Sequence, residues 1–313
     1  MEKELGVLPE DETRDLGEGI RETNRKGEVK STPARSRLPA QSTPFVGRKD
    51  EIKVLAERMA APEVRLLTLT GQGGIGKIRL ALELAKTIMD CFSHGVFFIG
   101  IAGLRSTDEL EGELVKALEL ASDKKTGRKG QIFNFLRHRN VLLVMDNFEH
   151  LPEAGGLVLN LLAQAPFLKI LVTSRTRLKL EGEHLFRVSD LSRPNALVSG
   201  NEKAVDLRRI EETWDAVALF LSAAQRVRPD VKLNSDNFQA ISRICNLTGG
   251  MPLALILAAG WMDVFPPGKI AENIQENLDF LRTDIRDMPK RHQSITAVLE
   301  TSWSCLTQKE KNS

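Results

Sequence analysis

Residues 66–78 have the sequence LLTLTGQGGIGKI, an apolar run followed at once by a glycine-rich turn. Helical periodicity begins directly after the turn, with Leu80 and Leu84 spaced by four residues. A strand, a glycine loop and a helix in this order form the context of a phosphate-binding loop. Glycines let the backbone turn its N–H groups inward, and the new helix adds the positive end of its dipole. The stretch therefore predicts a phosphate site at the start of a helix.

The loop matches the pattern G-x-x-x-x-G-K and departs from the usual sequence at the next position. Lys77 can reach the β- and γ-phosphates of a nucleotide as a point charge. Ile78 follows where Ser or Thr would offer a hydroxyl to magnesium, and its aliphatic side chain cannot ligate a cation that requires oxygen. The candidate nucleotide-binding residues here are Gly71, Gln72, Gly73, Gly74, Ile75, Gly76, Lys77, Ile78 and Arg79. We expect a strong phosphate site and a weakened magnesium site.

Composition bounds the class of protein. The net charge is +2 with 27% charged residues, so bulk charge does not indicate a nucleic-acid-binding surface. The three cysteines lie far apart and match no metal spacing, which favours reduced thiols in the cytoplasm. No apolar run approaches a membrane span, and residues 1–30 are too charged for a secretion signal. We expect a soluble cytoplasmic protein with no membrane contact and no nucleic-acid site in this part of the chain.

Apolar runs alternate with helical patterns through the first two thirds of the chain. The predicted strands are residues 66–70, 95–99, 141–145, 169–173 and 184–188. Strands that are apolar throughout and alternate with helices indicate a parallel sheet covered on both faces. The sequence thus predicts an α/β nucleotide-binding domain at residues 45–195. Only helical periodicity follows, which predicts a small all-helical lid domain at 210–285, with Ser235 as the cap of one of its helices.

Three further segments lie outside these domains. Residues 1–22 carry an acidic helical pattern with too few apolar positions to form a core. Residues 23–44 are rich in Lys, Arg, Ser and Pro, a composition typical of an extended linker. Residues 286–313 begin an amphipathic helix whose apolar face needs a partner.

Three single residues complete the candidate site, and each also has a simpler explanation. Asp146 ends a buried strand, where a carboxylate can hold magnesium, although an Asp-Asn turn after a strand explains it equally well. Arg175 follows the fourth strand and could touch a terminal phosphate, or it is an ordinary surface arginine. Pro252 could offer a flat apolar face to adenine, or it simply starts a helix.

Taken together, these motifs have the order and spacing of one family. From Thr43 to about Ser304 the chain resembles the NB-ARC branch of the STAND ATPases. The matching motifs are residues 43–48 beside adenine and ribose (Phe45, Val46 and Arg48), the Walker A loop at 71–77, Walker B at 142–146, the sensor arginine at 173–175 and the G-x-P lid motif at 250–254. The resemblance implies a P-loop sheet of strand order 5-1-4-3-2. It also implies catalytic roles for Asp146 and Arg175, and ADP or ATP between the α/β and lid domains.

The two ends resemble parts of neighbouring domains in the same family. Residues 1–22 are similar to the last helix of a bacterial transcriptional activator domain (BTAD), and 294–306 to the first helix of a winged-helix domain. Regulators of the SARP type join a DNA-binding domain and a BTAD to NB-ARC. The resemblance implies a piece of such a regulator, whose partners are its other domains and, in the active form, further copies of itself.

A second departure bears on catalysis. Asn147 stands where many hydrolytic relatives carry Glu, and an amide cannot act as a general base. With Ile78, this predicts at most a weak ATPase and favours a nucleotide-binding switch. Two alternatives remain: a slow ATPase in which Glu149 positions water, and a scaffold whose loop binds nothing and whose helices bind partners. Ile78 counts against the first alternative, and the intact Lys77 loop against the second.

Overall fold

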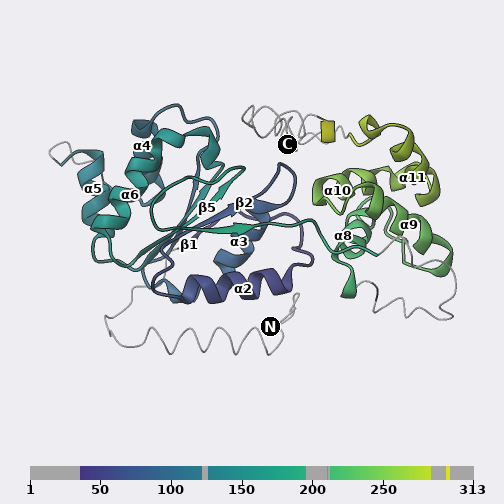
Figure 1. Ribbon diagram of the computed structural model, residues 1–313, viewed down its shortest axis with the longest axis horizontal. Coiled ribbons are helices and arrows are strands. Elements are labelled where there is room, and N and C mark those ends of the chain that lie inside the picture. The colour runs from purple at the N-terminus through teal and green to yellow at the C-terminus, as the bar shows by residue number, and fades with distance from the viewer. Residues whose placement is uncertain (1–35, 122–125, 195–209, 211, 283–293, 297–313) are drawn as a thin grey trace, which may run out of the picture. The chain divides into compact units, whose positions relative to one another are not determined.

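The computed structural model describes residues 36–121, 126–194, 210, 212–282 and 294–296 (Figure 1). It divides into two compact units. Among the described residues, the first unit holds 36–42 and those within Lys49–Leu69 and Ile78–Phe186. The second unit holds Thr43–Arg48, Thr70–Lys77 and the described residues from Arg187 to 296. The phosphate loop therefore packs as part of the second unit.

The first unit is built on a six-stranded sheet of order β1-β3-β4-β5-β2-β6. Its strands are β1 (Ser36–Arg37), β2 (Leu66–Thr70), β3 (Val96–Gly100), β4 (Val141–Asp146), β5 (Leu168–Ser174) and β6 (Glu183–Arg187). The pairs β1–β3, β3–β4 and β4–β5 are parallel. If the five predicted strands are numbered along the chain, they correspond to β2, β3, β4, β5 and β6. The expected order 5-1-4-3-2 is then β6-β2-β5-β4-β3, and the sheet confirms it. The short β1 lies in the predicted linker and adds an edge strand that the sequence did not indicate.

Helices cover both faces of this sheet, as its continuous apolar strands predicted. The helices are α2 (Lys49–Ala60), α3 (Lys77–Thr87), α4 (Thr107–Ala117), α5 (Gly127–Leu136) and α6 (Gly155–Gln164). Alternate residues of β4 face opposite ways, and Leu143 packs into the core that includes α4, α5 and α6. Its neighbours Leu142 and Val144 lie outside that core and are also fully buried. Figure 1 shows α4, α5 and α6 as one group, apart from α2 and α3.

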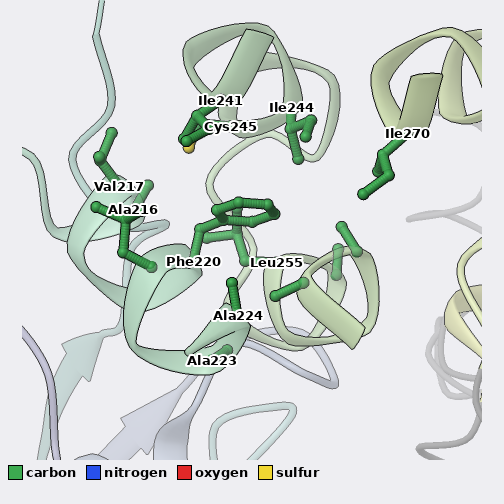
Figure 2. Close-up of a cluster of buried hydrophobic side chains, with 14 of the residues drawn as sticks. Ala216, Val217, Phe220, Ala223, Ala224, Ile241, Ile244, Cys245, Leu255 and Ile270 are labelled. Atoms are coloured by element: carbon green, nitrogen blue, oxygen red, sulfur yellow. The ribbon is translucent and has the colours of Figure 1, made fainter. Parts of the chain in front are cut away.

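The second unit contains four helices in the described part of the chain. They are α8 (Asp215–Ala224), α9 (Ser235–Leu247), α10 (Pro252–Gly260) and α11 (Pro267–Glu276). Figure 2 shows the ring of Phe220 from α8 beside Leu255 of α10 and facing Ile241 and Cys245 of α9. Burial raises the pKa of the Cys245 thiol to about 12, so this cysteine is a core residue and not a reactive one.

Local capping chemistry fixes where several helices begin. Ser106 caps α4, and its Oγ accepts the N–H of Glu109 at 3.2 Å, as the capping-box pattern predicts. The expectation that Ser235 caps α9 is wrong, because the side chain of Asn234 accepts the N–H groups of Asp236 and Asn237. Asparagine and serine both cap well, so the pattern alone left the position open by one residue.

Two of the predicted helices fall outside the described residues. They are the helix within residues 1–22 and most of the helix predicted near 294–306. Within the residues that are described, no helix combines the length and apolarity that crossing a membrane requires.

Candidate functional site

The glycine loop connects β2 to α3 and packs tightly in the second unit. Gly74 has φ +77°, a conformation that side-chain-bearing residues rarely adopt. A Cβ at this position would lie 3.0 Å from Cβ and 3.2 Å from Cδ2 of Leu253. Ile75 as a whole is only 2% exposed, so its side chain packs inside the protein. Glycine at position 74 thus serves both the turn and the approach of the lid motif.

Lys77 is the first residue of α3, and its ammonium group lies over the loop. Its Nζ donates hydrogen bonds to the carbonyl of Gly71 at 2.8 Å and to that of Gln72 at 3.0 Å. Ile78 follows on the helix with a half-buried aliphatic side chain and no oxygen. The structure therefore places a cation at the loop, and the residue that follows it on the helix carries no hydroxyl.

Arg48 ties the motif at residues 43–48 to the loop. Its side chain is buried, and Nη2 donates to the carbonyls of Ile75 and Ser189, each at 2.9 Å. Its backbone N–H donates to Oδ2 of Asp215 at 2.9 Å, in the first turn of α8. Gly47 has φ +75°, and a Cβ there would lie 2.4 Å from Cγ of Asp215. Sequence resemblance predicts a nucleotide contact for Arg48, and these hydrogen bonds show that Arg48 is also a cross-link within the second unit.

The lid motif contacts the same loop. Pro252 is the first residue of α10, and the backbone N–H of Leu253 donates to the carbonyl of Gly74 at 3.2 Å. A Cβ on Gly76 would lie 3.8 Å from Cγ of Pro252. The chain leading to α8 also joins this region, since the N–H of Leu191 donates to the carbonyl of Gly250 at 3.0 Å. The phosphate loop, the lid motif and the segment that leads to α8 are therefore in contact within the second unit.

Asp146 lies at the carboxyl end of β4 in the first unit, where neighbouring groups orient its carboxylate. The hydroxyl of Thr173, on β5, donates to Oδ1, and Nδ2 of Asn147 donates to Oδ2 at 2.8 Å. The N–H of Asn147 in turn donates to Oγ1 of Thr173 at 3.1 Å. Asn147 has φ +61°, which asparagine tolerates better than most residues. Thr173 and Asn147 thus hold the carboxylate in a fixed orientation at the end of β4.

Arg175 and Glu149 form an ion pair that sequence reasoning did not find. Nε of Arg175 lies 3.3 Å from Oε1 of Glu149, and the N–H of Arg175 donates to Oε2 at 3.3 Å. The two side chains are 11% and 7% exposed. The sequence signal for this pair was Glu149 shortly after β4 and Arg175 directly after β5. It predicts an ion pair only once β4 and β5 are known to be adjacent.

The described residues offer little to a metal ion beyond Asp146. Over the ranges that the structure covers, no three His, Cys, Asp or Glu side chains gather in a metal-binding cluster. Magnesium in proteins is usually bound by one or two carboxylates together with water and substrate phosphates. Asp146 fits the first of these roles, and Ile78 supplies no second oxygen.

Residues 48–192 match the NB-ARC domain family. The chain contains an NB-ARC domain. Its motifs at 71–77 and 142–146 fall inside the matched range, and the helices of the second unit follow it.

Curated relatives are longer proteins. The chain is 30% identical over 270 residues to an uncharacterised protein of Mycobacterium tuberculosis, covering 86% of this chain and 63% of that protein. It is 30% identical over 248 residues to a protein of the same organism named provisionally as an HTH-type transcriptional regulator, covering 79% and 26%. It is also 28% identical over 254 residues to regulatory protein AfsR of Streptomyces griseus, covering 72% and 26%. The NB-ARC domain of this chain is thus related to parts of larger regulators.

Solved structures support the fold. Cdc6p from Pyrobaculum aerophilum matches with a TM-score of 0.52 at 14% identity, covering 77% of this chain and 65% of that one. The ORC2 protein of Aeropyrum pernix matches with a TM-score of 0.50 at 12% identity, covering 76% and 71%. At such identities the likeness shows only the shared α/β core and its helical region.

Proposed function

We propose that this chain binds ADP or ATP at the phosphate loop and acts as the nucleotide-dependent switch of a larger transcriptional regulator. NB-ARC domains bind adenine nucleotides, and the loop here keeps the glycines and the lysine that such binding needs. The observation that carries the proposal is the hydrogen bond from the N–H of Leu253 to the carbonyl of Gly74. It makes the first turn of α10 a direct neighbour of the loop that would hold the phosphates.

The loop residues supply the means of sensing a ligand. Lys77 now bonds to the carbonyls of Gly71 and Gln72, and phosphate oxygens accept stronger, charge-assisted hydrogen bonds. A bound phosphate would therefore draw Nζ away from these carbonyls and reshape the loop backbone. Because Gly74 bonds to Leu253, that change would reach α10, and the cross-link from Arg48 to Ile75 would carry it toward α8.

We expect the switch to depend on binding far more than on hydrolysis. Asp146 and water would provide the protein's share of magnesium coordination, since Ile78 has no oxygen. The side-chain amide of Asn147 is bonded to Asp146 and cannot take a proton from water. Any ATPase activity should accordingly be weak.

The relatives suggest the setting of this switch. Two of them carry names of regulators, and each is far longer than the matched segment. We infer that the other domains of a cytoplasmic bacterial regulator, of the BTAD-containing kind, are the partners of this module. In that arrangement the other domains would contact DNA, and the conformation of this domain would depend on the bound nucleotide.

Isothermal titration calorimetry with ADP and with ATP tests the proposal. The wild-type chain should bind both nucleotides, and Lys77→Ala should abolish binding. Lys86→Ala is the matched control, because Lys86 is an exposed lysine in the last turn of the same helix. A wild-type chain that binds neither nucleotide would overturn the proposal and favour a scaffold.

A further inference from the structure

The ends of β4 and β5 hold two acidic residues in different surroundings. Asp146 ends β4 and is oriented by Thr173 and Asn147. The left-handed conformation of Asn147 then turns the chain into a short 3-10 helix, Phe148–His150, anchored by the buried ring of Phe148. This turn directs Glu149 back to the end of β5, where it meets Arg175. The two carboxylates therefore serve different tasks.

The pair of Glu149 and Arg175 is held by two contacts and is largely removed from water. One carboxylate oxygen lies near Nε of Arg175, and the other accepts the backbone N–H of the same residue. Charges in such surroundings are screened less than those on the surface, so each strongly affects the other. Removing one partner of a buried pair leaves the other charge uncompensated. Both oxygens of Glu149 are thus engaged with Arg175, which argues against Glu149 as the residue that positions water.

We propose that Glu149 is a positioning residue that restrains Arg175 and thereby biases the site toward ADP over ATP. The inference rests on the proposed function and on the family resemblance, which implies that Arg175 senses the terminal phosphate. A guanidinium bonded to a carboxylate must give up part of that pair to bond to a phosphate. The carboxylate of Glu149 therefore competes with the third phosphate of ATP, while ADP presents no such group.

The variant Glu149→Gln tests this competition, because it keeps the size of the side chain and removes its charge. Its affinity for ATP should rise about tenfold, the usual scale of one hydrogen bond to a charged group, and its affinity for ADP should not change. Glu153→Gln removes an equal charge from an exposed position in the next 3-10 turn and should leave both affinities unchanged. In an Arg175→Gln background, Glu149→Gln should no longer alter the preference between ATP and ADP.

A merely structural role of the pair would change stability without changing this preference. Unfolding of wild type, the two single variants and Glu149→Gln/Arg175→Gln in denaturant should show coupling between the two residues without any nucleotide. If the coupling is present but the ATP-to-ADP preference of Glu149→Gln equals that of wild type, the inference is wrong and the proposed function stands. If the wild type binds neither nucleotide, the inference and the proposed function are both wrong.

A second variant covers the case in which Glu149→Gln does not fold. Glu149→Asp keeps the charge but withdraws the carboxylate from Arg175 by one methylene, so ATP affinity should again rise, by less than in Glu149→Gln. Loss of ATP hydrolysis with unchanged binding in either variant would instead assign Glu149 to the positioning of water and overturn the inference.

Discussion

Leu253 donates its backbone N–H to the carbonyl of Gly74 at 3.2 Å, so the first turn of α10 is bonded to the phosphate loop. Helix-terminal N–H groups have no partner within their own helix, and this one is satisfied by the loop. The contact leaves little space, since a Cβ on Gly74 would meet the side chain of Leu253. Loop and lid motif are therefore packed and hydrogen-bonded together.

Gly74→Ala should disturb this contact in two ways. The new methyl group would lie 3.0 Å from Cβ of Leu253, and φ at this position is +77°. We expect a loss of about 1–3 kcal/mol in the free energy of unfolding, together with weaker nucleotide binding. Urea denaturation and calorimetry measure the two effects. Gly268→Ala, in α11 with no atom within 4 Å of the added Cβ, should be neutral or slightly stabilising.

Arg48→Met should separate the motif at residues 43–48 from the loop. The carbonyls of Ile75 and Ser189 would each lose a donor in a buried region, at a cost of about 1–3 kcal/mol in unfolding free energy. Nucleotide affinity should fall as the loop loses support. Arg187→Met replaces an exposed arginine and is the matched control. Unchanged stability in Arg48→Met would show that the cross-link contributes nothing.

Ile78→Thr should restore the missing hydroxyl beside Lys77. In the wild type we expect ATP affinity to depend little on magnesium and ADP to bind at least as well as ATP, because Ile78 has no oxygen and Asp146 with water must supply the protein's share of the coordination. The threonine variant should bind ATP more tightly with magnesium than without it. Calorimetric titrations in magnesium and in EDTA compare the two chains. A wild type that already prefers MgATP strongly would mean that another oxygen completes the site.

The stability of the first unit should fall on mild acidification through His94. Burial, and then the positive charge of Arg139, hold the pKa of this imidazole below its ordinary 6.5. Its Nδ1 accepts the N–H of Asn140 at 3.1 Å, which a protonated ring nitrogen cannot do. Because the folded pKa lies below the unfolded one, the stabilisation is complete above pH 6.5 and is lost as pH falls through the folded pKa.

Urea unfolding of the wild type at pH values on both sides of 6.5 measures this loss. His94→Gln should remove that part of the pH dependence, because glutamine does not titrate. His138→Gln, at an exposed position, should retain it. Equal slopes for wild type and His94→Gln would assign the acid sensitivity to other groups.

Local patterns in the sequence predicted most of the fold. The glycine spacing at 71–76 predicted the loop, continuous apolar runs predicted a sheet buried on both faces, and family resemblance predicted its strand order. The cap of α9 was misplaced by one residue because Asn234 and Ser235 are both good capping residues. Such signals depend on neighbours in the chain and need no knowledge of tertiary contacts.

The site contacts were harder to predict, because they join distant residues. Arg48 bonds to Asp215 across 167 positions, and its role as a cross-link has no local signature. The same holds for Glu149 and Arg175, which meet only because β4 and β5 are adjacent. The sequence showed that Asn147 stands where many hydrolytic relatives carry Glu. Its left-handed backbone conformation, which suits asparagine, became visible only in the structure.

Hydrogen exchange of the Leu253 amide tests the coupling of loop and lid most directly. This amide is bonded to Gly74, so its exchange reports the contact itself. We predict that adding ADP or ATP changes its protection together with that of the loop amides, and that the amides of α11 are unaffected. The same experiment on Lys77→Ala should show no change. Unaltered exchange at Leu253 in a wild-type chain saturated with nucleotide would contradict the account, because phosphate binding at the loop would then leave its hydrogen bond to the lid motif unchanged.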